Sequence, residues 1–208
     1  MLRYFKPFVF LACLGPVGWL AWRGFHGELG ANPIEAITHG TGDWTLIFLL
    51  VTLSVTPLRK ITRQYWLIGL RRMFGLFAFF YGTLHLMTYV WLDKFFDVHE
   101  MLHDIAKRRF ITAGMTAFAL MIPLALTSTK WAIRKLGKRW QVLHRLVYAS
   151  AAAGVIHYLW LVKADKKKPL EYGTVLTALL LYRAAVWIAT RSRGRSAAVP
   201  ATIEASRG

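Results

Sequence analysis

The chain alternates between long apolar blocks and short polar segments that are rich in lysine and arginine. The blocks have about 15 to 20 residues each, close to the length that an α-helix needs to cross a lipid bilayer. They predict six spans, at residues 7–22, 42–56, 73–92, 111–127, 140–162 and 170–190. We therefore expect an all-α fold, a polytopic membrane helix bundle of about six transmembrane helices.

The two ends of the chain need separate interpretation. The block at 7–22 resembles a secretory signal, but Arg23 and Gly24 follow it in place of a small-x-small cleavage pattern. We predict that this block is retained as the first span. Residues 192–208 are rich in Ser, Ala, Arg and Gly, a polar composition typical of disorder. One transmembrane domain at 1–191 and a disordered cytoplasmic tail are therefore expected.

The basic residues between the blocks indicate the orientation, because the cytoplasmic loops of membrane proteins carry an excess of lysine and arginine. With six spans the two termini share a side, and that side receives most of the basic residues. The opposite side receives all ten acidic residues except Glu204. Both termini are therefore predicted to be cytoplasmic, and the basic run at 166–168 is the exception to the pattern.

Composition narrows the class of protein. A formal net charge of +17 suggests nucleic acid as a partner, but the chain is 56% apolar and its aromatic residues lie inside the apolar blocks. A nucleic-acid surface would instead interleave aromatic with basic residues on one face. The single cysteine, Cys13, excludes an intrachain disulfide and a Cys-x-x-Cys-His site for covalent haem.

Two histidines lie well inside predicted spans. Counted from the cytoplasmic side, His85 is about 18 Å along its helix and His157 about 26 Å along its own, so both lie in the outer half of the membrane. Ionisable side chains within a bilayer are costly and usually face a site or a cavity. Two facing imidazoles can be the axial ligands of a haem iron. The alternative is that each ring hydrogen-bonds to a neighbouring helix.

Three glycines lie near these histidines in the sequence, at Gly75, Gly82 and Gly154. They would leave room for a flat macrocycle between helices. Small residues also serve ordinary close packing of membrane helices, so both interpretations stay open.

His144 lies at the start of the 140–162 span, about 20 Å before His157 in helical rise. It would place a second haem near the cytoplasmic face, although an ideal helix turns the two rings about 140° apart. No other span offers a histidine at that depth. Arg71 lies at that depth instead. Three roles stay open for it: an unusual ligand of the haem iron, a partner of a haem propionate, or a plain anchor at the membrane interface.

The segment from His99 to His103 matches the HExxH pattern of zinc proteases, with Glu100 in the place of the base. It lies in a short loop between two spans, and no third ligand is evident. We interpret it as an amphipathic interfacial helix rather than as a protease site.

Five segments carry a resemblance to a known family: TGDWTLIFLLVTLSVTPLR at 41–59, RRMFGLFAFFYGTLHLMTYVW at 71–91, KRRFITAG at 107–114, PLALTS at 123–128 and WQVLHRLVYASAAAGVIHYLW at 140–160. They resemble the MsrQ (YedZ) family, the haem-binding membrane subunits of bacterial methionine sulfoxide reductase systems, within the ferric-reductase-like transmembrane superfamily. The resemblance covers most of a core at about 41–163 and is loose elsewhere.

The resemblance implies haem b, one or two per chain. His85 and His157 match the family's histidine pair, and His144 matches its further histidine. Arg71 stands where the oxidase relatives carry a fourth histidine. FMN is implied as well, although no residue of this sequence can be assigned to it.

The resemblance also implies a role in the bacterial inner membrane. The chain would be no enzyme on its own, but an electron-transferring subunit supplied by the quinone pool or a cytoplasmic flavin reductase. Its acceptor would be a periplasmic MsrP-type molybdopterin reductase that repairs oxidised methionines. Electrons would enter near His144 and leave between His85 and His157. Two alternatives stay open: a self-contained ferric or oxygen reductase, and a non-redox transporter that uses the histidines for protons or metal.

Overall fold

The computed structural model describes the backbone of residues 2–198 and the side chains of residues 5–191. Within this range all regular structure is helical. The elements are α1 (Leu2–Phe25), α2 (Pro33–Thr62), the 3₁₀ turn η1 (Tyr65–Leu67), α3 (Ile68–Met87), the π-helical turn η2 (Thr88–Asp93), α4 (Val98–Lys107), α5 (Arg109–Leu126), α6 (Lys130–Leu136), α7 (Lys138–Leu143), α8 (Leu146–Leu161) and α9 (Lys167–Ala198).

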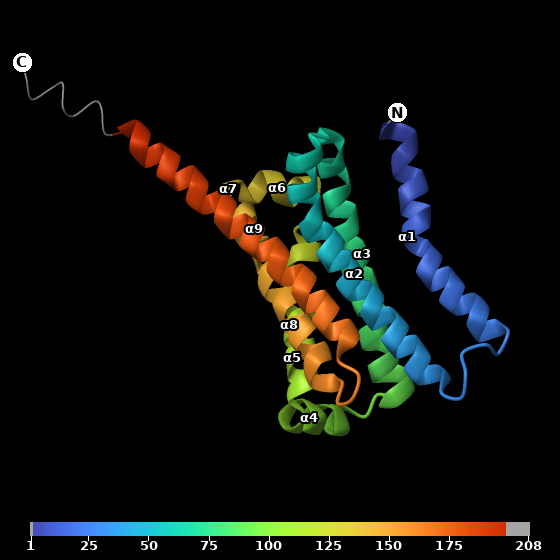
Figure 1. Cartoon of the computed structure of the whole chain (residues 1–208). Coiled ribbons are helices and arrows are strands. Elements are labelled where there is room, and N and C mark those ends of the chain that lie inside the picture. Colours follow the sequence, from blue (N-terminus) through green and yellow to red (C-terminus); the bar gives the residue numbers. More distant parts are fainter. Residues whose placement is uncertain (1, 199–208) are drawn as a thin grey trace, which may run out of the picture.

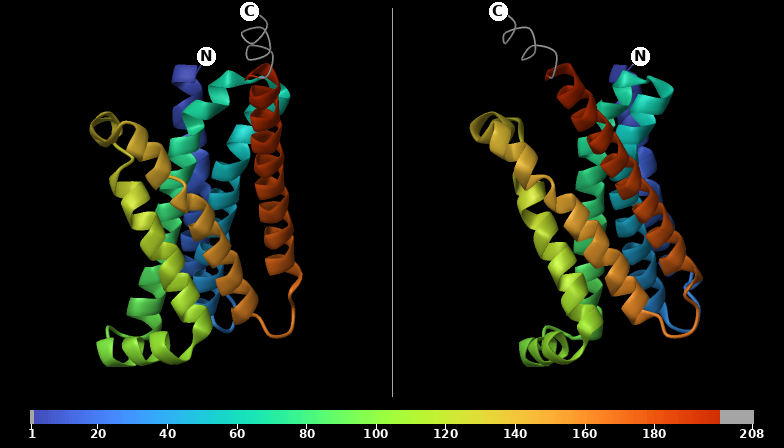
Figure 2. Two further views of the ribbon diagram at one scale, coloured as in Figure 1. Left: turned by 90° about the vertical axis from the view of Figure 1, so that its left-hand side faces the viewer. Right: turned by 60° about the vertical axis from the view of Figure 1, so that its left-hand side comes forward.

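Most of these helices are built to cross a membrane. Among the described residues, five stretches are long and apolar enough: Phe5–Phe25, Pro33–Thr62, Tyr65–Asp93, Arg109–Leu126 and Lys167–Arg191. A further helix, α8, runs beside α5 but has only 16 residues (Figure 2). The predicted all-α membrane bundle is therefore confirmed.

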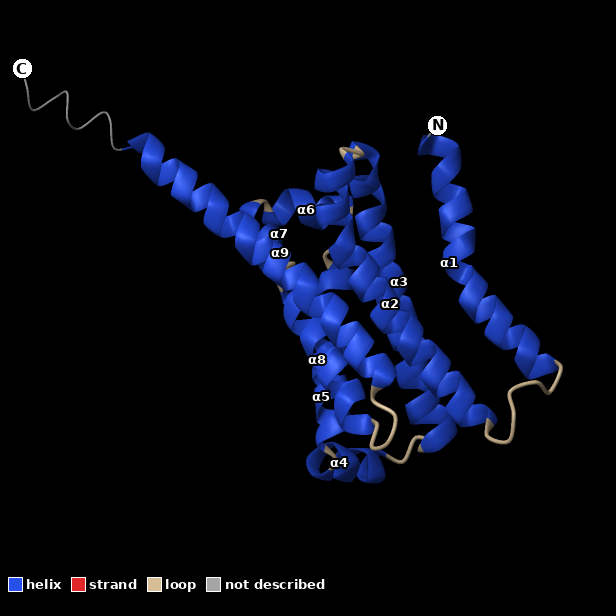
Figure 3. Ribbon diagram, viewed as in Figure 1, coloured by secondary structure: helices blue, strands red, loops and turns tan. Residues whose placement is uncertain are grey.

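The two described ends of the chain lie at the same end of the bundle, and α4 lies at the opposite end (Figure 1). The loops at 26–32 and 162–166 share the α4 end (Figure 3). This arrangement is what an even number of crossings requires. Which end faces the cytoplasm remains a prediction from the charge pattern.

The fifth predicted span, at 140–162, is wrong as one continuous helix. α7 ends at Leu143 and α8 begins at Leu146. Two bonds to the end of α5 hold α7 at this joint: Trp140 Nε1 donates to the Thr127 carbonyl at 3.0 Å, and His144 Nε2 lies 3.0 Å from Thr127 Oγ1. Hydropathy does not report such bonds, so the joint could not be predicted from the apolar pattern.

Two other helices extend beyond their apolar blocks. α2 begins at Pro33, where the Asn32 side chain accepts a hydrogen bond from Glu35 N, a typical N-cap with proline in the first turn. α9 continues to Ala198, past the predicted end of the last span at 190. Residues 199–208 of the predicted tail lie outside the described residues.

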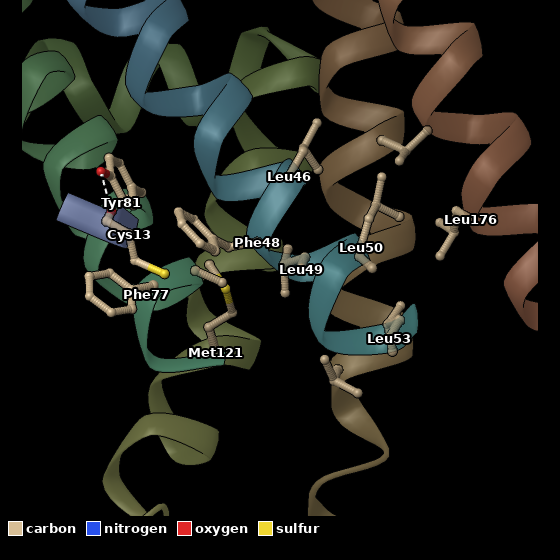
Figure 4. Close-up of a cluster of buried hydrophobic side chains, with 14 residues drawn as sticks. Cys13, Leu46, Phe48, Leu49, Leu50, Leu53, Phe77, Tyr81, Met121 and Leu176 are labelled. Atoms are coloured by element: carbon tan, nitrogen blue, oxygen red, sulfur yellow. Dashed lines mark hydrogen bonds between the residues drawn. The ribbon is translucent and has the colours of Figure 1, made fainter. Parts of the chain in front are cut away.

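The core joins α1 to the α2–α3 pair through one tyrosine (Figure 4). Pro16 removes a backbone donor from α1. At the next residue, Val17, the Tyr81 hydroxyl accepts from the backbone N–H at 3.1 Å, and it donates to the Cys13 carbonyl at 2.9 Å. A side chain inserted into the helical ladder in this way satisfies both backbone groups. Cys13 is buried there without a disulfide partner, in agreement with a packing role.

Candidate functional site

A cavity of about 580 Å³ lies between α2, α3, α5 and α8, towards the α4 end of the bundle. Its volume is typical of sites for small molecules and cofactors. Both predicted membrane histidines line it, and the side chains around them are mainly apolar. Its lining includes Leu46, His85, Phe110, Met115, Phe118 and His157.

Each of the two histidines is held by a carbonyl of a neighbouring helix or its first turn. His85, on α3, has Nδ1 2.9 Å from the Thr38 carbonyl of α2. His157, on α8, has Nδ1 2.6 Å from the Phe110 carbonyl of α5. A carbonyl can only accept, so Nδ1 carries the proton in both rings. The Nε2 atom of each ring therefore carries a lone pair that can bind a metal ion. No described residue is hydrogen-bonded to this atom in either ring.

The two rings lie close together in the cavity, with their planes nearly perpendicular. Their centroids are 6.0 Å apart and their planes make an angle of 77°. Metal–imidazole bonds of about 2 Å, added to the two ring radii, place the centroids of opposed ligands about 6 Å apart. The observed spacing is therefore the one that two imidazoles need to hold one metal ion between them.

Glycines make room for both rings, but not all are the ones the sequence indicated. A Cβ at Gly114 would lie 2.7 Å from His157 Nδ1, and one at Gly42 would lie 3.1 Å from His85 Cε1. Neither position can therefore carry a side chain without displacing its histidine. Of the three glycines noted above, Gly82 and Gly154 line the cavity, whereas Gly75 packs against Thr52.

The π-helical turn that follows His85 was not predicted from the sequence. In η2 the Thr88 hydroxyl donates to the His85 carbonyl at 2.7 Å and accepts from the Thr38 hydroxyl at 3.1 Å. The same Thr38 supplies the carbonyl that holds the His85 ring. π-helical turns are rare and frequently lie at functional sites. The two threonines thus lock α3 to α2 beside the ring.

His144 lies away from this pair, at the joint between α7 and α8. Its Nε2 is 3.0 Å from Thr127 Oγ1, and its ring stacks on Trp140 at a centroid distance of 3.9 Å. Arg71 lies close enough for its charge to act on the His144 ring. His144 and His157 do not share a site.

Comparisons with known proteins agree with this arrangement. Residues 38–155 match the family model described as "Ferric reductase like transmembrane component". A protein from Herminiimonas arsenicoxydans named "Protein-methionine-sulfoxide reductase heme-binding subunit MsrQ" is 51% identical over all of this chain and 95% of its own length. The chain belongs to the MsrQ family.

Other MsrQ proteins are similarly close. The MsrQ of Azospira oryzae is 56% identical over 88% of this chain and 79% of its own length. That of Bordetella parapertussis is 52% identical over 91% of this chain and 93% of its own length. No solved structure gives a significant match. With the family's transmembrane description and the five apolar helices, this MsrQ-family chain is a multi-pass membrane protein.

The HExxH segment forms α4, an amphipathic helix across the end of the bundle (Figure 1), as expected. The carboxylate of Glu100, which a protease would use as base, is paired with Lys94. His99 and His103 are exposed to solvent. No group of three histidine, cysteine, aspartate or glutamate side chains in the described part of the chain is placed to bind a metal ion.

An ion-pair network around the buried side chains of Lys94 and Asp104 fixes α4 to the end of η2. Lys94 Nζ lies 2.9 Å from Asp104 Oδ2, and Asp104 Oδ1 lies 3.1 Å from Arg108 Nε. The side chains of Lys94 and Asp104 are only 7% and 4% exposed. Hydrogen bonds to Glu100 and then Asp104 raise the pKa of Lys94, and the bond to Lys94 lowers the pKa of Asp104. The network supports the rim of the cavity, because Arg108 lines it.

Proposed function

We propose that this chain is the haem-carrying, electron-transferring membrane subunit of a protein-methionine-sulfoxide reductase system. It would lie in the bacterial inner membrane with both termini in the cytoplasm. Its donor would be the quinone pool or a cytoplasmic flavin reductase, and its acceptor a periplasmic MsrP-type molybdopterin reductase. The names of its relatives support the haem and the system.

The observation that carries the proposal is the opposed pair His85 and His157. Their ring spacing of 6.0 Å suits a shared metal ion, and each Nδ1 bond to a carbonyl both orients its ring and makes Nε2 a better ligand. Among the residues that the structure describes, two protein ligands converge here, so the remaining ligands of an iron would have to come from a macrocycle. With Cys13 as the only cysteine, the haem would be held without thioether bonds, as in b-type cytochromes.

Haem would supply reversible one-electron chemistry, which no side chain of this site offers. The residues of the chain would do the rest. Gly42 and Gly114 let helix backbones lie directly against the two rings, and Thr38 and Thr88 keep His85 from turning. The apolar lining excludes water and so stabilises the less charged state of a bound iron centre.

A second haem site is part of the proposal at the other end of the bundle, with His144 and Arg71 as its protein groups. His144 Nε2 lies 3.0 Å from Thr127 Oγ1, so iron binding at this nitrogen would require that bond to be released. One or two haem b groups are therefore proposed per chain. FMN rests on the family resemblance, and no residue of this chain is assigned to it.

The direction of electron flow rests on the charge pattern. The His144 end carries mostly basic residues, as cytoplasmic surfaces of membrane proteins do, and the His85–His157 cavity lies at the other end. Electrons would enter on the His144 side and leave near α4.

The test is haem content per chain in purified protein. His85→Ala and His157→Ala should each abolish the haem absorbance of the cavity site, while His103→Ala, an exposed histidine on α4, should retain it. Wild-type absorbance in both cavity variants would refute the ligand assignment. Reduced wild-type protein mixed with a purified periplasmic reductase should then be reoxidised; a failure of that step alone would leave the haem site standing and refute the partner.

A further inference from the structure

Three arginines from three helices converge at the end of the bundle opposite the cavity. Arg59 lies near the end of α2, Arg71 near the start of α3 and Arg183 within α9. The charges of Arg59 and Arg183 both act on Arg71. All three side chains are half-buried rather than extended into solvent. Three like charges at this depth repel one another and are costly unless something compensates them.

The chain itself does not supply the compensation. Every described carboxylate that forms an ion pair, from Glu35, Asp43, Asp93, Glu100 or Asp104, does so with a partner other than these arginines. Among the described residues, the arginine cluster therefore has no anionic partner.

The hydrogen bonding of Arg183 shows that its position is fixed. Its Nη1 donates to the Tyr148 hydroxyl at 2.5 Å, and its Nη2 donates to the Leu53 carbonyl at 2.6 Å. The guanidinium also lies over the Tyr148 ring, 5.0 Å from its centroid. An arginine that merely extends to the membrane surface would not be held between two helices in this way.

Donors remain unused around this fixed arginine. Arginine has five N–H donors, and the Nε atoms of both Arg59 and Arg183 are buried with no hydrogen-bond partner. The Thr56 hydroxyl, one turn before Arg59 on α2, is buried and unpartnered as well. Buried polar groups are nearly always paired in native proteins, so these orphaned donors indicate a ligand.

We propose that Arg59 and Arg183 form a binding site for a phosphate group, with the Thr56 hydroxyl as a further donor, while Arg71 remains with His144 at the proposed second haem site. A phosphate carries up to two negative charges and three strong acceptor oxygens, which matches several guanidinium groups better than one carboxylate does. The phosphate belongs either to a soluble phosphomonoester or to an anionic lipid headgroup, since the cluster lies where spans approach the membrane surface.

The experiment measures the thermal midpoint of purified full-length protein in two arms. In the first, delipidated protein in an uncharged detergent is titrated with inorganic phosphate against sodium chloride of equal ionic strength. In the second, the protein is compared in nanodiscs of phosphatidylglycerol and of phosphatidylcholine. A true site should raise the midpoint by about 5 to 10 °C at a hundredfold excess of ligand over its Kd. A rise in the first arm identifies a soluble phosphate ligand, and a rise confined to the second identifies lipid.

The variants Arg59→Gln and Arg183→Gln should lose that rise. Arg72→Gln and Arg191→Gln are matched controls, because both are exposed arginines on the same helices as Arg71 and Arg183, and they should keep it. If Arg183→Gln does not fold, Arg183→Lys takes its place, because it retains the positive charge. This variant should show a smaller rise of the thermal midpoint than wild type. No rise in either arm, or the same rise in every variant, would overturn the site.

Haem absorbance is recorded on the same samples, so that the phosphate site and the proposed haem function are tested separately. Both glutamine variants should retain the absorbance of the His85–His157 site. A loss of haem absorbance in these variants with no phosphate or lipid effect in wild type would also overturn the proposal, because the arginines would then pair with a porphyrin carboxylate.

Discussion

The two ends of the bundle place histidine in opposite chemical states. At the α4 end, His85 and His157 use Nδ1 to donate to a carbonyl and leave Nε2 free towards a cavity. At the other end, His144 uses Nε2, which lies 3.0 Å from the Thr127 hydroxyl. That hydroxyl donates its own proton to the Pro123 carbonyl at 2.6 Å, so the ring nitrogen must be the donor.

The difference shows that membrane depth alone does not make a histidine a metal ligand. What matters is which ring nitrogen the protein occupies, because that bond sets the tautomer and orients the lone pair. The cavity pair is arranged for ligation as it stands. His144 would have to give up its bond to Thr127 before Nε2 could bind a metal, so a site there forms with a local rearrangement.

The largest effect is expected from closing the space behind a cavity ring. In Gly114→Ala the new Cβ would lie 2.7 Å from His157 Nδ1, closer than side chains normally approach. The ring must move, and it loses both its carbonyl anchor and its spacing to His85. We expect most of the haem absorbance of the cavity site to disappear while the protein still elutes as a folded species in size-exclusion chromatography.

Gly75→Ala is the matched control for that variant, because its Cβ would lie 3.7 Å from the Thr52 methyl group in ordinary contact. It should retain full absorbance. Equal haem loss in the two variants would mean that helix packing, and not the ring position, controls the site.

The next largest effect concerns the network that supports the cavity end. Lys94→Met removes the shorter of the two ion pairs of Asp104 and leaves it, among the described residues, with the more exposed Arg108 as its cationic partner. We expect a clear fall in the thermal midpoint and no such fall for Lys107→Met, an exposed lysine on α4. A fall of equal size in both would show that the buried pair is not responsible.

The same network predicts how stability depends on pH. The pKa of Asp104 is lowered in the folded protein, so its contribution is present above the unfolded pKa and is lost as pH falls through the lower folded value. The pKa of Lys94 is raised, so its contribution is present below the unfolded pKa and is lost as pH rises through the higher folded value. The difference in midpoint between wild type and Lys94→Met should therefore be flat from about pH 5 to pH 10 and shrink outside that window.

Hydropathy predicted the bundle and most of its spans correctly, because apolar length is a property of the sequence alone. It also placed His85 and His157 inside predicted spans, and the structure has them on α3 and α8. It was wrong at 140–162, where the joint between α7 and α8 depends on bonds from Trp140 and His144 to Thr127 on another helix. Contacts between segments distant in the sequence leave no periodic signal within either segment.

The parts of the site that the sequence did not indicate have the same origin. Gly42 and Gly114 matter because of which ring each one faces, and neither glycine lies close to its histidine in the chain. The π-helical turn η2 has no composition that marks it, and it is recognised only from the backbone bonds and the hydroxyl pair of Thr38 and Thr88. The histidine ligands themselves remain a prediction until haem content is measured.

A smaller effect on haem than that of Gly114→Ala is expected at the His144 end of the bundle. His144→Ala should remove the absorbance of a second site and leave that of the His85–His157 site, because the two sites share no described contact. Electron transfer from the cytoplasmic side should slow. The readout is haem per chain together with the rate of reduction by a cytoplasmic donor in vesicles. Wild-type stoichiometry and rate would make His144 a residue of the α7–α8 joint alone.

The smallest effect is expected when the His144 nitrogen is released without removing the ring. Thr127→Val removes the hydroxyl that bonds to both His144 Nε2 and the Pro123 carbonyl, and it should cost about 1–3 kcal/mol of stability, the usual contribution of two hydrogen bonds. Thr116→Val is the control on the same helix, since its exposed hydroxyl bonds only to the Thr112 carbonyl. If His144 binds haem by giving up Thr127, the valine variant should bind the second haem more tightly than wild type, because it no longer loses that bond. Unchanged affinity with lowered stability would mean that His144 keeps a structural role even when haem is present.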